Sequence, residues 1–268
     1  MFTVSRCVIS LNDLKGLRVH TQAELMQKKW FYPFELNDGT VLSTYVPDDI
    51  TSIHATRWQM LDALVKREFK SAAEIANADV LDIACHQGYF TTQLARLGFK
   101  HVRAVDARAE HVADTTLISK AMELSNVSAA IGNVFDLAKT ETPRDVVLQF
   151  GLLYHLENPI GALRVARALT RRVCVIETQV VPNMGGPVDW GSYRFVRPLK
   201  GIFGIIDEME EIHAPEASVT GICLAPSVEG LLWILHAVGF ARAELLAVPD
   251  DGYEQLKYGK RVMVAAYV

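Results

Sequence analysis

Short apolar runs alternate with segments of helical periodicity along most of this 268-residue chain. Continuous apolar runs bounded by turn residues are typical of buried parallel strands, and three- and four-residue spacing is typical of amphipathic helices. Their alternation predicts an α/β fold with a mostly parallel sheet between helices. We expect seven strands, at residues 80–83, 102–105, 127–131, 145–150, 173–180, 241–248 and 261–268.

The strongest local signal is a strand, turn, helix and strand within residues 80–106. The first apolar run leads into a turn that ends at Gly88, and the second run ends at Asp106. The spacing between these two residues is about that by which a Rossmann-like unit places a carboxylate near a ribose held over the turn. The unit therefore predicts a nucleoside-like ligand. A strand–helix–strand unit without any ligand is the alternative.

The turn keeps only one glycine of the dinucleotide pattern D-x-G-x-G-x-G. Ala84 and His86 occupy the first two glycine positions. Because a pyrophosphate needs bare backbone beside it, this turn disfavours a dinucleotide. The stretch resembles motif I of the class I S-adenosylmethionine (SAM) methyltransferases, with Asp106 matching their ribose-binding acid. That resemblance implies that the cofactor contacts lie at Asp82, Ala84, His86, Gly88 and Asp106.

A second informative stretch follows the expected strand at 145–150. It reads Gly151-Leu152-Leu153-Tyr154-His155 and reaches a proline four residues later. Ligands bind beyond the carboxyl ends of parallel strands, which is where this stretch falls. The pattern Gly-Leu-Leu-Tyr-His-x-x-x-Pro resembles the tRNA wobble-uridine carboxymethyltransferase family, as does the aromatic segment at 30–36.

The resemblance also implies adenine contacts at the end of the third strand. Asn133 would face the adenine amino group, and the Val134 backbone would meet a ring nitrogen. Helix capping by Asn133 is the alternative on spacing alone. Phe150, at the end of the fourth strand, completes the expected cofactor site.

Methyl transfer to a hydroxyl or amine needs a base with a pKa near neutrality, which a histidine provides. His155 is our candidate for that base, and the alternative is a loop cap. Tyr154 would line the sulfonium, because an aromatic face favours a nearby cation. Five histidines lack a motif context and are expected on the surface or in packing: His54, His101, His111, His213 and His236.

We expect no metal ion at this site. Metal-assisted methylation needs oxygen ligands clustered after the fourth and fifth strands. Phe150, Gly151 and Leu152 stand where acids would be required, and Glu177 alone does not make a site.

The sequence predicts two structural parts in this chain. Residues 1–70 form an N-terminal extension on the substrate side, with a capping-box pattern at 21–24 and a helix at 51–69. Residues 71–268 form the cofactor-binding domain. Within it, residues 182–225 are too long for a simple connection, and we expect a substrate-covering insert there.

Composition and charge limit the classes of molecule that this protein is expected to bind. The net charge of −4 disfavours nucleic acid and favours a small-molecule acceptor. No apolar run approaches the roughly 20 residues that a bilayer crossing requires, and the first residues lack a secretory signal pattern. The four scattered cysteines fit a reducing, cytoplasmic location. The sequence allows the chain to form a homo-oligomer.

We therefore predict SAM-dependent methyl transfer, yielding S-adenosylhomocysteine, to a hydroxyl or amine of a small metabolite. One alternative is a tRNA-modifying methyl- or carboxymethyltransferase. Phe31 and Tyr32 stand where that family carries a lysine before the Pro-Phe pair, which favours ordinary SAM over carboxy-SAM. Another alternative is a non-catalytic regulator with the same fold. The tRNA alternative would require a basic groove formed by Arg164, Arg167, Arg171, Arg172, Lys28 and Lys29.

Overall fold

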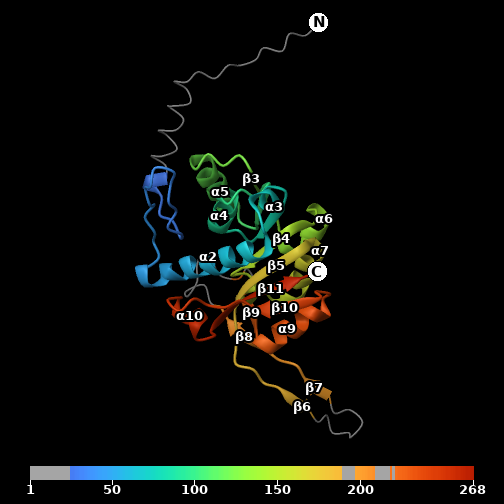
Figure 1. The fold of residues 1–268 in the computed structure, drawn as a ribbon. Coiled ribbons are helices and arrows are strands. Elements are labelled where there is room, and N and C mark those ends of the chain that lie inside the picture. The colour runs from blue at the N-terminus through green and yellow to red at the C-terminus, as the bar shows by residue number, and fades with distance from the viewer. Residues whose placement is uncertain (1–24, 189–196, 209–217, 219–220) are drawn as a thin grey trace, which may run out of the picture.

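The computed structural model describes residues 25–188, 197–208, 218 and 221–268. These residues form three layers, in which a central sheet lies between helices (Figure 1). The seven strands have the order β10-β11-β5-β4-β1-β2-β3. Strand β11 is antiparallel to both of its neighbours, and the other adjacent pairs are parallel. The structure thus confirms the predicted mostly parallel α/β sheet.

Each predicted apolar run overlaps a strand of this sheet, although the run predicted at 241–248 is a strand only over Arg242–Leu245. The burial of the four residues after Asp79 in β1, and of the last five residues of β4, agrees with strands covered on both faces. The strands are β1 (Asp79–Ile83), β2 (His101–Asp106), β3 (Val127–Ile131), β4 (Arg144–Phe150), β5 (Thr170–Gln179), β10 (Arg242–Leu245) and β11 (Arg261–Tyr267).

Several helices begin at a side-chain cap that the sequence supplies. Ser71, Asn158 and Ser227 each accept a hydrogen bond from a backbone N–H three residues on, which satisfies a donor that the helix leaves unpaired. The helices are α2 (Asp48–Glu68), α3 (Ala72–Ala76), α4 (Tyr89–Arg96), α5 (Ala109–Ala121), α6 (Leu137–Thr140), α7 (Pro159–Leu169), α9 (Val228–Ala237) and α10 (Glu254–Lys257), with single 3₁₀ turns η1 (Val134–Asp136) and η2 (Leu153–His155).

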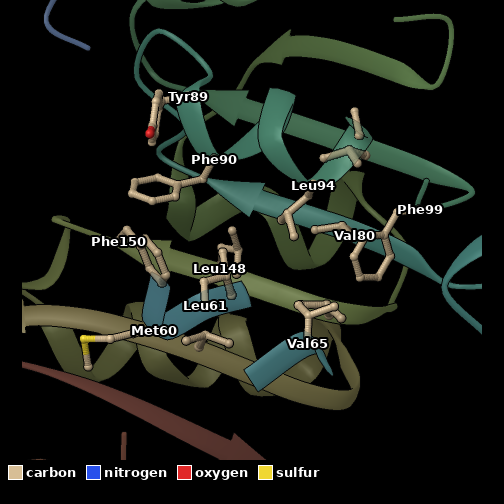
Figure 2. Close-up of a cluster of buried hydrophobic side chains, with 14 of the residues drawn as sticks. Met60, Leu61, Val65, Val80, Tyr89, Phe90, Leu94, Phe99, Leu148 and Phe150 are labelled. Atoms are coloured by element: carbon tan, nitrogen blue, oxygen red, sulfur yellow. The ribbon is translucent and has the colours of Figure 1, made fainter. Parts of the chain in front are cut away.

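Two hydrophobic clusters cover the two faces of the sheet. Helices α2, α4 and α5 contribute to one cluster, and α6, α7 and α9 to the other. In the first cluster, side chains of α2 pack with β1, β4 and α4; Met60, Leu61 and Val65 lie in this group (Figure 2). Because each fully buried leucine contributes about 2 kcal/mol, α2 is an integral part of the core. The proposed domain boundary at residue 70 stays a prediction.

The insert at 182–225 contains two small hairpins within its described residues. Strands β6 (Gly186–Val188) and β7 (Arg197–Leu199) extend away from the sheet (Figure 1). Strands β8 (Phe203–Asp207) and β9 (Ile222–Pro226) form the second hairpin. The Leu224 N–H donates to the Leu156 carbonyl at 3.2 Å, so this hairpin is attached to the loop after β4.

Some sequence predictions lie outside the described residues. These are the capping box at 21–24, the start of the N-terminal extension, His213 and parts of the insert. Among the described helices, none combines the length and apolar character needed to span a membrane.

Candidate functional site

The loop between β1 and α4 follows a glycine-type path despite its side chains. Ala84 has a φ of 60°, His86 a φ of 51° and Gly88 a φ of 81°. These are the three glycine positions of the motif, and all three adopt the left-handed conformation that favours glycine. For a non-glycine residue that conformation costs about 1–2 kcal/mol. The loop therefore stores strain at the edge of the sheet where ligands bind.

Gly88 is required at its position by space as well as by φ. A Cβ atom there would lie 2.6 Å from the Thr115 Cγ2 atom, so α5 packs directly against the end of the loop.

Asp106 holds the loop from the end of β2. Its carboxylate accepts the His86 N–H at 2.9 Å and the Arg108 N–H at 2.9 Å. His111 Nδ1 lies 3.1 Å from the same carboxylate, and the His111 ring packs on the His86 ring at a centroid distance of 4.0 Å. Burial opposes ionisation, but these hydrogen bonds hold the pKa of Asp106 below its usual value.

The position of Asp106 suits its predicted role. An ionised carboxylate offers about four acceptor sites, so a ribose hydroxyl would share it with the groups already bound. His111 was expected on the surface or in packing, and the structure places it at Asp106 instead. The sequence could have indicated this contact, because His111 lies at the start of the helix that follows Asp106.

Asp82 lies inside the sheet rather than at its edge. Its carboxylate accepts the Thr91 hydroxyl at 2.6 Å, which fixes α4 relative to β1. Burial raises the pKa of Asp82 to about 7. The structure thus assigns Asp82 a supporting contact, and its direct cofactor contact stays a prediction.

Replacing Asp82 with asparagine should change how stability depends on pH. The unfolded carboxyl ionises near pH 4, whereas the folded one ionises near 7, so Asp82 makes the wild type lose stability as pH rises through this window. We expect Asp82→Asn to be more stable than wild type at pH 8, on the order of 4 kcal/mol, and similar at pH 4. Urea unfolding at both pH values tests this, and an equal difference at both would contradict it.

The aromatic segment at 30–36 lies against the loop. Gln87 accepts the Phe31 N–H at 2.8 Å and donates to Asp114 at 3.0 Å. The Tyr32 ring stacks on the Tyr89 ring at 5.1 Å and 9°. The loop, the N-terminal segment and α5 are therefore joined through one glutamine.

A buried ionic network follows β4 and β5. The Glu177 carboxylate accepts Arg57 at 3.0 Å and Arg261 at 2.9 Å, and the Gly151 N–H at 3.1 Å. Arg261 also donates to the Tyr154 hydroxyl at 2.9 Å. Burial would raise the pKa of Glu177, but the two guanidinium groups lower it below its usual value. Two buried cations share one carboxylate, which leaves a local positive charge.

Sequence reasoning missed this network. It set Glu177 aside as isolated, and it did not single out Arg57 or Arg261. The two arginines come from α2 and β11, so no local pattern relates them to Tyr154. Only the assembled sheet brings them together.

His155 lies beside Tyr154, with ring centroids 4.1 Å apart. Its Nδ1 is 2.7 Å from the Glu208 carboxylate. Glu208 also accepts the Ser218 N–H at 2.8 Å and the Cys223 thiol at 3.1 Å. Burial opposes ionisation, but these hydrogen bonds hold the pKa of Glu208 below its usual value.

The ligand atoms of His155, Glu208 and Cys223 lie within 4.8 Å of one another, a spacing that would also suit a metal ion. The expectation of no metal rested on the residues next to β4 and β5 alone. It did not consider this group, because Glu208 and Cys223 come from the insert. Burial and the neighbouring carboxylate raise the pKa of the Cys223 thiol to about 12, and the thiol donates a hydrogen bond to Glu208.

The remaining predicted cofactor residues lie at the same edge of the sheet. The Phe150 ring meets the Phe90 ring edge-on at 4.8 Å. Asn133 accepts the Phe135 N–H at 3.0 Å and caps η1, as its alternative interpretation supposed. Val134 is buried, whereas Phe135 is 41% exposed, so an apolar surface is open to a flat ligand there. The adenine contacts of Asn133 and Val134 stay predictions.

The basic residues named for a nucleic-acid groove are separated. Arg171 pairs with Asp145 and Arg172 with Glu68, both near the amino end of β5. Lys28 pairs with Asp114, near the loop at the opposite edge. These cations are divided between the two edges and are partly neutralised by acids.

The strand order, the loop at 84–88 and the acid ending β2 have the arrangement of the class I SAM-dependent methyltransferase fold. Residues 75–184 match the model of a family described as a methyltransferase domain, which agrees with this assignment.

Two kinds of known protein are similar to this chain. It is 21% identical over 179 residues to the tRNA U34 carboxymethyltransferase of Desulfotalea psychrophila, covering 66% of this chain and 53% of that protein. The chain thus spans about half the length of that curated relative.

Solved structures share the fold at low identity. The N-terminal domain of EvdMO1 with bound S-adenosylhomocysteine (SAH) has a TM-score of 0.67 and 19% identity, covering 96% of this chain and 97% of that chain. Magnesium protoporphyrin IX methyltransferase of Synechocystis PCC 6803, also with SAH, has a TM-score of 0.53 and 16% identity, covering 84% and 89%.

Proposed function

We propose that this chain transfers the methyl group of SAM to a hydroxyl or amine of a small-molecule metabolite. The observation that carries the proposal is the His155–Glu208 pair beside Tyr154, at the carboxyl end of β4. Strand order reverses between β1 and β4, and ligands of open α/β sheets bind in the crevice beyond that point.

The cofactor would lie over the loop at 84–88. Asp106 would accept a ribose hydroxyl, and Asn133 and Val134 would meet the adenine. Phe150 and Tyr154 would form an aromatic wall near the sulfonium. The relatives crystallised with SAH support this placement, as does the ionised state of Asp106.

His155 would act as the general base. When bound, SAM supplies an activated methyl group, so the protein has to align the acceptor and remove its proton. The Glu208 carboxylate holds the His155 imidazole by Nδ1 and would stabilise the cation that forms as the proton arrives. The neighbouring hairpin of β8 and β9 would cover the acceptor.

The small-molecule acceptor is favoured by the charge distribution. The net charge is −4, and three of the six basic residues named above, Lys28, Arg171 and Arg172, pair with acids at two separate edges. A nucleic-acid acceptor would require a continuous basic surface to contact phosphates.

A carboxymethyl donor is the second candidate, because one observation favours it. The family that the chain resembles holds the extra carboxylate of carboxy-SAM with cations or hydroxyls. The aromatic segment lacks the expected lysine, but Arg261 places a cation 2.9 Å from the Tyr154 hydroxyl. Comparing the affinities of SAM and carboxy-SAM decides between the donors.

The acceptor class is tested by transfer of label from methyl-labelled SAM. The protein would be incubated separately with a macromolecule-free metabolite extract and with purified tRNA. We expect protein-dependent label in the small-molecule fraction, absent with heat-inactivated protein. Label recovered in tRNA alone would contradict the small-molecule proposal.

A further inference from the structure

His54 is a buried polar residue that the proposed mechanism does not use. It lies on α2 and has no solvent exposure. Its ring centroid is 4.5 Å from that of Tyr32 and 5.1 Å from that of Phe31, both in the aromatic segment that covers the loop. The sequence interpretation placed it on the surface or in packing, and the surface alternative is wrong.

Neither ring nitrogen of His54 has a hydrogen-bond partner among the described residues. Burial, together with the nearby cations Arg57 and Arg261, lowers the pKa of His54 to about 2, so the imidazole is neutral. A neutral imidazole carries one N–H donor and one acceptor nitrogen. Leaving both unpaired inside a protein is costly, and a leucine or phenylalanine would fill the same space without that cost.

A second unpaired group lies one helical turn away on the same helix. The buried Nε of Arg57 has no partner in the described part of the chain, although its Nη2 donates to Glu177. Residues three apart lie on one face of a helix. Two orphaned polar groups on one helix face indicate that a ligand supplies their partners.

The surroundings of His54 identify the part of the ligand that would reach it. The Phe31 and Tyr32 rings that contact His54 also contact the ring of His86, in the loop over β1. On the other side, the next turn of α2 carries Arg57, which shares Glu177 with Arg261 beside Tyr154. His54 therefore lies between the predicted cofactor loop and the predicted methyl-transfer residues. With the nucleoside over the loop and the sulfonium near Tyr154, the amino-acid end of the cofactor would reach this position.

We propose that His54, assisted by the Arg57 Nε–H, binds the amino-acid end of the cofactor. The chemistry matches: a carboxylate would accept from the imidazole and guanidinium N–H groups, and an ammonium would donate to the second imidazole nitrogen. The inference rests on the proposed function, because it requires SAM or SAH at this site. A polar group of the acceptor is the other source of partners.

Two probes that differ only at this end test the proposal. SAH carries the amino-acid end, and 5′-methylthioadenosine lacks it. In wild type we expect SAH to bind more tightly than methylthioadenosine by calorimetry. In His54→Phe we expect SAH to lose about 10-fold or more in affinity, with methylthioadenosine binding unchanged. Urea unfolding should show that the ligand-free variant is at least as stable as wild type.

A second variant at His54 and a control variant elsewhere separate loss of ligand contacts from misfolding and from unspecific effects. His54→Gln retains one donor and one acceptor, and should recover part of the SAH affinity if the phenylalanine variant folds poorly. His236→Phe, at an exposed position on α9, should change neither affinity. Unchanged SAH binding in both His54 variants overturns the proposal in favour of packing or the acceptor, as does an equal loss for both probes. Failure of folded wild type to bind either probe instead refutes the proposed cofactor.

Discussion

Replacing Glu177 with glutamine should lower the free energy of unfolding by about 3–5 kcal/mol, because the change leaves two buried guanidinium groups without their counter-charge. Glu177 is fully buried and its carboxylate accepts from both Arg57 and Arg261. The glutamine keeps the shape of the side chain, so the loss reports charge rather than packing. Urea unfolding at pH 7 measures it.

The control is an acid that pairs at the surface. Asp62 pairs with Lys66 along α2, and Asp62→Asn should cost less than about 0.5 kcal/mol. Since the pKa of Glu177 is lowered in the folded state, its stabilising contribution is complete above the unfolded pKa and is lost as pH falls through the lower folded pKa. The difference between Glu177→Gln and wild type should therefore shrink in acid. Equal losses in the two variants at pH 7 would mean that the buried network contributes little.

Replacing His155 with alanine should reduce the turnover number by about 10²–10⁴-fold, the usual contribution of general acid–base catalysis. The affinity for SAH should change little, since His155 is placed on the acceptor side of the cofactor. The measurement is steady-state transfer from labelled SAM to the acceptor found in the metabolite extract, with SAH binding measured in parallel.

Glu208→Gln refines this prediction. The amide can still hold the imidazole in place, but it cannot balance the charge of the imidazolium. We expect a smaller loss than in His155→Ala, together with an altered pH–rate profile. His236→Ala on α9 serves as the control. Full turnover by His155→Ala would remove the base from the proposed mechanism.

The elements that could be predicted from sequence are those set by local pattern. The strands follow apolar runs, and Gly88 and Asp106 follow from the spacing of one strand–helix–strand unit. The loop path was also within reach, because Ala84 and His86 adopt the conformation of the glycines that they replace. Their side chains raise the conformational free energy of the loop, but the loop keeps the backbone path of the glycine motif.

The groups that sequence reasoning missed are brought together by the fold. Arg57 and Arg261 meet Glu177 from elements at opposite ends of the chain, and Glu208 reaches His155 from a hairpin in the insert. No periodicity relates residues separated by so much sequence. His54 was missed for another reason, since a histidine within an amphipathic helix looks like a packing residue until its unpaired nitrogens are seen.

The central claim is that this chain binds the SAM nucleoside through Asp106, and calorimetric titration with SAH tests it most directly. We expect wild type and the exposed-site control Asp136→Ala to bind SAH with similar affinity. Asp106→Asn should bind about 10-fold more weakly, because the hydrogen bond from a ribose hydroxyl to a charged acceptor is weakened. Absence of binding by folded wild type, or equal binding by Asp106→Asn, would contradict the account.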